Sequence, residues 1–234
     1  MASTRGAVLW SGSPRLAHGW SLLRGASVSA ALVREFIRPA VRAIPSAMAL
    51  RLGSCRISLP AEVPAGVASR WTFTNGGLEV SVTTAGFKDH DVAMEFLLCL
   101  GQGLWERLSD VELRAYWTLL GGEISMGIEG EIDEQALEEK RCLFESQSHA
   151  NDVEWLARYG RASFAGTVAE YVHCLWHEVP VRTGPDYLPA PPLRLRLELL
   201  AQWFTPNRGY RLFPVAQLRA GPSPFPRACS ALDP

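Results

Sequence analysis

The segment from Glu170 to Glu178 holds the residue types in this chain that could do chemistry. His173 and His177 lie four residues apart, and Glu170 precedes the first of them by three. In a helix these spacings place side chains on one face, one turn above another. Imidazole nitrogens and carboxylate oxygens suit zinc, iron or manganese, so Glu170, His173 and His177 are predicted as candidate metal ligands.

The same segment also has an interpretation without chemistry. The helix carries an apolar arc whose centre lies nearly opposite the glutamate and the histidines. This arc contains Phe164, Val168, Tyr171, Val172, Leu175 and Trp176. Glu170 and His173 would then face solvent as a weak surface pair. A metal site would need a cleft and a carboxylate from a second element, for which Glu95, Gln102 and Glu106 form the best polar stripe.

Other sequence motifs add no catalytic prediction. Cys174 follows His173 at the place where a zinc-metalloprotease motif has glutamate, so a hydrolase is not predicted. The chain has no dinucleotide-binding glycine motif, no P-loop, no G-x-S-x-G and no C-x-x-C. Asp89-His90-Asp91 looks like a ligand cluster, but its place at a predicted helix start favours capping. Whether the chain is an enzyme stays open, and a divalent metal such as zinc is the one cofactor considered.

The elements that must position these residues begin with a β-hairpin at residues 70–84. Apolar and polar residues alternate on both sides of Asn75-Gly76, a sequence that favours a tight hairpin turn. The helical patterns that follow span about residues 89–108, 109–120, 133–141, 151–160, 162–177 and 193–204. Ser109 and Glu112 form a predicted capping box, and Gly121-Gly122 and Gly160 are expected to end helices. The predicted fold is mainly α (α+β), a compact bundle of five to six helices with an N-terminal β-hairpin.

Each of five predicted helices carries one tryptophan. These residues are Trp105, Trp117, Trp155, Trp176 and Trp203. A row of aromatic rings could stack bases or sugars. Aromatic residues on amphipathic helices usually belong to the core, and we predict core positions for them.

Charge divides the chain at Arg56. Up to this residue there are eight arginines and one acidic residue, Glu35, whereas the remainder has 15 basic and 23 acidic residues. An Arg-rich, acid-poor start is typical of an organelle presequence, and it also fits a gene start placed upstream of a true one at Met48. Residues 1–56 are therefore predicted as a disordered leader, residues 57–214 as a single helical domain, and residues 215–234 as a Pro-rich disordered tail.

Composition also limits the partners and the compartment. The longest apolar window, residues 92–105, is too short and too polar to cross a bilayer. The acidic remainder has no basic stripe for phosphates, so neither nucleic acid nor membrane is expected as a partner. Five widely spaced cysteines predict reduced thiols in the cytoplasm, with a mitochondrial location as the alternative if the leader is a presequence.

Two functions follow from these patterns. The first is a soluble, non-enzymatic helical domain that mediates protein interaction. Its docking site would be the proline-rich connection at residues 185–192, the tail at residues 222–226 or the hairpin edge. The alternative is a metal-dependent enzyme that uses the Glu-x-x-His-x-x-x-His face of Glu170, His173 and His177.

Overall fold

A computed structural model describes residues 15–25, 28–63, 66–74, 77–145, 153–177 and 183–212. Its strands are β1 (Ser21–Arg24), β2 (Cys55–Leu59), β3 (Ser69–Thr74) and β4 (Gly77–Val82). Its helices are η1 (Ala17–Gly19), η2 (Leu32–Ile37), α1 (Arg38–Ala43), α2 (Ser46–Leu52), α3 (Asp89–Trp105), α4 (Asp110–Ser125), α5 (Glu134–Glu145), α6 (Val153–Trp176) and α7 (Ala190–Trp203). The predicted α+β class is confirmed. The finer prediction, a bundle of five to six helices with an N-terminal hairpin, describes the fold imprecisely.

The predicted hairpin is half of a mixed sheet. The strand order is β1-β2-β4-β3, in which β1, β2 and β4 run parallel and β3 runs antiparallel to β4 at one edge. The buried side chains of β2 and β4 alternate along each strand and form one apolar face. The hairpin strands are thus confirmed, but their Asn75-Gly76 turn lies outside the described residues.

The prediction that residues 1–56 stand apart from the domain is wrong for the part that is described, residues 15–25 and 28–56. This part supplies β1 and the first residues of β2, together with η2, α1 and α2. Trp20, Leu22 and Ile37 are almost completely buried in the common core. Pro39 does not break the helix, because η2 is a π-helical segment that continues directly into α1.

The basic start of the chain pairs with its acidic remainder. Arg51 Nη1 donates to Glu112 Oε1 at 2.7 Å, which joins α2 to α4. Arg56 Nη1 donates to Glu79 Oε1 at 2.9 Å, and these residues are partners in the β2–β4 register. The charge boundary in the sequence is therefore not a domain boundary. The predicted tail at residues 215–234 lies outside the described residues.

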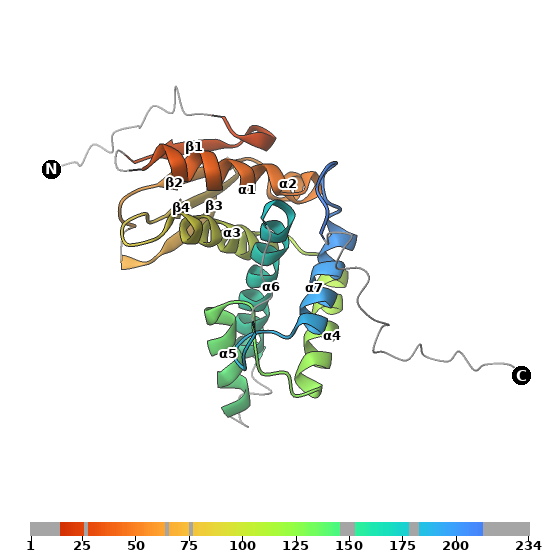
Figure 1. The fold of residues 1–234 in the computed structure, drawn as a ribbon. Helices are drawn as coiled ribbons and strands as arrows, with labels where there is room; N and C mark the ends of the chain where they lie inside the picture. The colour runs from red at the N-terminus through yellow and green to blue at the C-terminus, as the bar shows by residue number, and fades with distance from the viewer. Residues whose placement is uncertain are drawn as a thin grey trace, which may run out of the picture.

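The elements form two lobes (Figure 1). A sheet lobe contains β1–β4 with α1–α3, and a helical lobe contains α4, α5 and α7. The long helix α6 runs through both: its second half packs against α3 and α1, and its first half against α5. No helix in the described ranges is long and apolar enough to cross a membrane.

Local sequence signals predicted some helix ends correctly and others wrongly. The capping box of Ser109 and Glu112 is present at the start of α4, but α4 continues past Gly121-Gly122 to Ser125. Gly160 does not end a helix either, because α6 is continuous from Val153 to Trp176. A Cβ at Gly160 would clash with the Trp117 ring, so this glycine serves close packing. The five tryptophans predicted as core residues pack against the core, but each is only partly buried.

Candidate functional site

The histidine cluster, which we define as Glu170 and His173 of α6, His177 directly after this helix, and His90 of α3, lies where the two helices pack together. His90 is in the first turn of α3, and its Nε2 atom is 3.1 Å from His173 Nε2. The rings of His173 and His177 stack, with centroids 5.4 Å apart and an interplanar angle of 29°. The sequence motif thus gains a fourth member from a second helix.

Burial contradicts the interpretation of this helix face as a solvated surface. Glu170 is 7 % exposed and His173 is 4 % exposed, because α3 covers this side of α6. His90 is partly buried and His177 is exposed, so the cluster reaches from the interior to the surface. The apolar arc of α6 is buried too, and most of the second half of this helix lies inside the protein.

Hydrogen bonding in the histidine cluster is incomplete. His173 Nδ1 is buried without a hydrogen-bond partner, and the closest carboxylate oxygen, Glu170 Oε2, is 3.8 Å away. The indole Nε1 of Trp176, whose ring adjoins His173 and His177, is a second buried nitrogen without a partner. Buried polar atoms are usually paired, so two unpaired nitrogens at one place are unusual.

The other side chains that the sequence offered as ligands lie elsewhere. Glu95 accepts a hydrogen bond from Ser69 of β3 at 2.9 Å, and Gln102 accepts one from Trp71 of the same strand. Glu106 forms an ion pair with Arg161 at 2.6 Å. None of this polar stripe is a member of the histidine cluster.

Cys174, next to His173 in the sequence, is not set up as a thiolate. Burial and, to a smaller extent, the nearby Glu170 carboxylate raise its pKa to about 12. The thiolate is the form that attacks electrophiles and binds metals, so Cys174 is a poor ligand here. Across the described residues, no group of three or more His, Cys, Asp or Glu side chains is arranged to hold a metal ion.

The Arg196 cluster is a second group of buried polar side chains, located in the helical lobe. It consists of Glu123 on α4, Glu131, Lys140 on α5, Tyr159 on α6 and Arg196 on α7. Arg196 Nε donates to Glu123 Oε1 at 2.9 Å, and its Nη1 and Nη2 donate to the two oxygens of Glu131 at 2.8 Å each. Lys140 Nζ and the Tyr159 hydroxyl also donate to Glu131, at 3.1 and 2.6 Å. Charged residues surround Lys140 in the sequence of α5, a pattern typical of a solvated surface helix, but Lys140 is fully buried.

The Arg196 cluster is electrostatically self-contained. Burial alone would raise the pKa of Glu131, but the Arg196 guanidinium and the Lys140 ammonium lower this pKa from 4.5 to about 2. Burial tends to lower the pKa of Arg196, yet the Glu131 carboxylate holds it well above the ordinary value. Two glutamates balance one arginine and one lysine, so the cluster is neutral and tightly paired.

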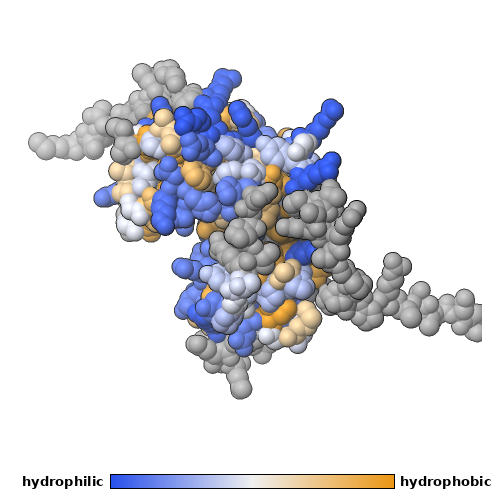
Figure 2. Space-filling model, viewed as in Figure 1, coloured by the Kyte–Doolittle hydropathy of each residue, from blue (hydrophilic) through white to orange (hydrophobic). Residues whose placement is uncertain are grey.

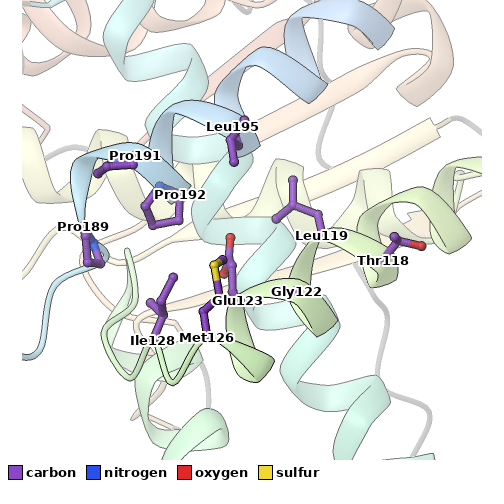
Figure 3. Close-up of a pocket in the computed structure, with 10 residues that line it drawn as sticks. All are labelled: Thr118, Leu119, Gly122, Glu123, Met126, Ile128, Pro189, Pro191, Pro192 and Leu195. Carbon is purple, nitrogen blue, oxygen red and sulfur yellow. The ribbon is translucent and has the colours of Figure 1, made fainter. Parts of the chain in front are cut away.

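A surface groove lies beside this cluster, between α4 and the start of α7 (Figure 3). We call it the α4–α7 groove. Its volume is about 520 Å³, and it is lined by Thr118, Leu119, Gly122, Glu123, Met126, Ile128, Pro189, Pro191, Pro192 and Leu195. Met126 and Leu195 are exposed large apolar residues. Figure 2 shows hydrophobic side chains at the surface of the helical lobe in this region.

Sequence reasoning missed several of these residues. The Asp89-His90-Asp91 motif is predicted to cap a helix, but no side chain caps α3, whose N-cap residue is Lys88. Arg196 follows Leu193 by three residues and precedes Leu200 by four, so it lies on the same face of α7 as these two leucines. An arginine among apolar residues on one helix face is the sequence feature that indicates a buried ion pair.

No family model matches this chain, and neither a curated protein nor a solved structure matches it. The geometry of the two clusters and of the groove is therefore the basis for any functional conclusion.

Proposed function

We propose that this protein is a non-enzymatic domain that mediates protein interaction by binding an apolar segment of a partner in the α4–α7 groove. One observation carries the proposal: an open groove of about 520 Å³ with almost wholly apolar walls. Ligand-binding sites are typically concave, mostly apolar and about 300–1,000 Å³ in volume, so the groove has the properties of a binding site. The proline-rich connection at residues 185–192, which the sequence suggested as a docking site, contributes three residues to one wall.

The two glycines of α4 support this interpretation. Each glycine inside a helix costs about 1 kcal/mol relative to alanine. A Cβ at Gly121 or at Gly122 would meet no atom within 4 Å, so packing does not require either glycine. Gly122 lines the groove, and the missing side chain at this position keeps the groove open. A local cost to stability without a packing reason is expected where residues serve binding.

The wall of the groove formed by the start of α7 is rigid in the absence of a partner. Pro189 is the N-cap residue of α7, and Pro191 and Pro192 follow in its first turn. Proline fixes φ, and a missing N–H is harmless at a helix start. A wall that is already ordered loses little conformational entropy on binding, which favours affinity for the partner.

The groove favours an amphipathic helix as the occupant. The one charged residue in the lining, Glu123, is 2 % exposed and bonded to Arg196, so it is not available to pair with a ligand charge. Recognition then depends on apolar shape. A helix that places apolar side chains at positions i, i+3 and i+4 presents such a shape to a groove between two helices.

The test compares two substitutions on the same helix. Gly122→Phe fills the groove, whereas Gly121→Phe adds the same side chain at a neighbouring open position that does not line it. The first measurement is fluorescence of anilinonaphthalene sulfonate, a dye that binds exposed apolar surface. We expect Gly122→Phe to reduce the dye signal and Gly121→Phe to leave it unchanged.

The second measurement uses helical peptides selected from a displayed library on the wild-type protein. We expect Gly122→Phe to weaken their binding roughly 30-fold or more, which corresponds to the loss of about 2 kcal/mol from a central contact. Equal binding by both variants would reject the groove as the docking site. Selection of small apolar ligands but no peptides would show a ligand pocket in its place.

The compartment is part of the same proposal. Cys55, Cys99, Cys142 and Cys174 are free thiols, as expected in the reducing cytoplasm. Removal of residues 1–56 as a mitochondrial presequence would take β1 out of the sheet, which makes the mitochondrial alternative the weaker one. The cysteine redox state in protein isolated under thiol-blocking conditions tests this assignment.

A metal-dependent enzyme is the second candidate function. The approach of His90 to His173 is the specific observation that favours it, because metal sites draw ligands from more than one element. The first requirement of such an enzyme is that metal binds at all.

A further inference from the structure

We infer that the histidine cluster binds one divalent transition-metal ion of the zinc, cobalt or nickel class, with His90 Nε2 and His173 Nε2 as its first two ligands. This site combines α3 and α6, and it does not depend on the function proposed for the α4–α7 groove. The ligand set differs from the sequence motif, because His90 enters and Glu170 moves from ligand to supporting residue.

The separation of the two nitrogens fits a shared metal. Two nitrogens that bind one zinc ion at 2.0–2.1 Å with a tetrahedral angle lie about 3.3 Å apart. A metal with right-angled ligands brings them to about 2.9 Å. The observed separation of 3.1 Å lies between these values. Both imidazoles therefore need little movement to bind the same ion.

In the positions that the described side chains occupy, no three potential ligands surround one point, so the proposal requires His177 to turn and become the third ligand. Three imidazoles around one tetrahedral zinc ion have ring centroids about 5 Å apart. The rings of His90 and His173 are 4.9 Å apart, those of His173 and His177 are 5.4 Å apart, and those of His90 and His177 are 6.2 Å apart. His177 is exposed, so a turn of its side chain can bring a nitrogen to the metal without repacking the core.

Glu170 supports the ligand His173. Its carboxylate lies 3.8 Å from His173 Nδ1, the ring nitrogen that does not face His90. A histidine that binds metal through Nε2 commonly donates its Nδ1–H to a carboxylate, which fixes the tautomer and strengthens the ligand. A small approach of these two groups would give the buried nitrogen its missing partner.

Charge also favours a cation at this place. Glu170 is buried, and within the described ranges it forms no ion pair with lysine or arginine. Buried carboxylates are normally compensated by a cation or a metal. A divalent ion beside His173 would supply positive charge close to this carboxylate.

The experiment is a titration of the full chain, freed of metal with EDTA and kept reduced, with zinc chloride by calorimetry and with cobalt chloride by visible absorption. We expect one equivalent of zinc to bind and a cobalt spectrum of low coordination number. Glu170→Gln should weaken zinc binding roughly 10- to 100-fold, as is usual for a supporting carboxylate. His90→Ala and His173→Ala should weaken it more than Glu170→Gln does.

Two control variants separate this site from incidental binding. His18→Ala removes a histidine of η1, and Cys142→Ser removes a partly exposed thiol; both should leave the zinc affinity unchanged. His90 is partly exposed, so His90→Ala should fold normally by circular dichroism even if His173→Ala does not. Absence of saturable binding, or binding that survives His90→Ala, would overturn the inference and leave a plain imidazole hydrogen bond.

Discussion

Two polar clusters each include residues of the same helix, α6, and they differ in how completely their side chains are paired. In the Arg196 cluster, each carboxylate, the guanidinium and the ammonium have hydrogen-bond partners within the protein. In the histidine cluster, one ring nitrogen of His173 has none. His173 is 4 % exposed, so exposure does not explain its unpaired nitrogen.

The difference indicates two separate roles. A buried cluster whose members satisfy one another has no valence left for a ligand, and its function is to hold elements together. The Arg196 cluster joins α4, α5, α6 and α7 in this way. An unpaired buried nitrogen calls for an explanation, and the metal ion that we infer at the histidine cluster would provide one. The largest perturbation of stability is therefore expected at the first cluster, and ligand dependence at the second.

The strongest test of this comparison is Arg196→Met. This change leaves the buried carboxylates of Glu123 and Glu131 without their main cation, and breaking a buried pair in this way costs about 3–5 kcal/mol of unfolding free energy. Urea denaturation at neutral pH measures the loss. Arg194→Met, on the same helix, is the matched control, because its exposed pair with Glu198 is worth less than about 0.5 kcal/mol. Equal losses in both variants would contradict a structural role for the Arg196 cluster.

The second-largest effect is expected from acid, which should weaken the Arg196 cluster. The pKa of Glu131 is about 2 in the folded protein against an ordinary 4.5. A lowered carboxyl pKa contributes stability that is present above the unfolded pKa and is lost as pH falls towards the folded one. This difference corresponds to about 3 kcal/mol, lost between about pH 5 and pH 2. Urea midpoints measured across this range should fall steeply for the wild type and less steeply for Glu131→Gln.

Glu95 is an internal control, because its pKa is shifted in the opposite direction from the pKa of Glu131. Burial raises its pKa, although a hydrogen bond from Ser69 opposes the change. A raised carboxyl pKa means that the folded state binds the proton more readily, so protonation of Glu95 stabilises the protein as pH falls. Glu95→Gln should therefore make the acid loss steeper. A flatter acid profile in Glu95→Gln would show that another group dominates.

The sequence predicted features that depend on neighbouring residues. The Ser109 capping box and the hairpin strands are of this kind, since each is fixed by residues within one or two turns of chain. The parallel strand β1 was missed because its partner is distant, with Ser21 opposite Arg56. The arginine-rich composition of residues 1–56 then suggested a leader, although the apolar residues between the arginines are buried in the core.

The candidate site was predicted only in part, for the same reason. Helical spacing placed Glu170, His173 and His177 on one face correctly, but spacing does not show which helix covers that face. His90 is 83 residues away from its neighbour His173 in the sequence. Lys140 lies four residues after Ala136 and three before Leu143, so all three fall on one face of α5. A lysine on the same helix face as two apolar residues is a sequence sign of a buried cation.

Metal addition sharpens the comparison at the histidine cluster. If zinc binds the folded state alone, a free concentration 100 times the dissociation constant raises the unfolding free energy by about 2.7 kcal/mol. We expect thermal melting of the wild type to shift upward with zinc and to return with EDTA. His90→Ala should show no shift, whereas Arg194→Met should shift as the wild type does. A shift of the same size in His90→Ala would place the metal elsewhere.

The smallest expected effect is that of His173→Leu in metal-free protein. His173 is 4 % exposed and Arg196 is fully buried, so the two substitutions remove side chains of similar burial. The loss at His173 is limited to one hydrogen bond with His90, whose partly exposed ring can turn to water. An apolar replacement of an incompletely paired group is nearly neutral, so we expect a change of at most about 1 kcal/mol in urea denaturation. A loss as large as that of Arg196→Met would mean that the histidines hold the lobes together, and the distinction between the two clusters would fail.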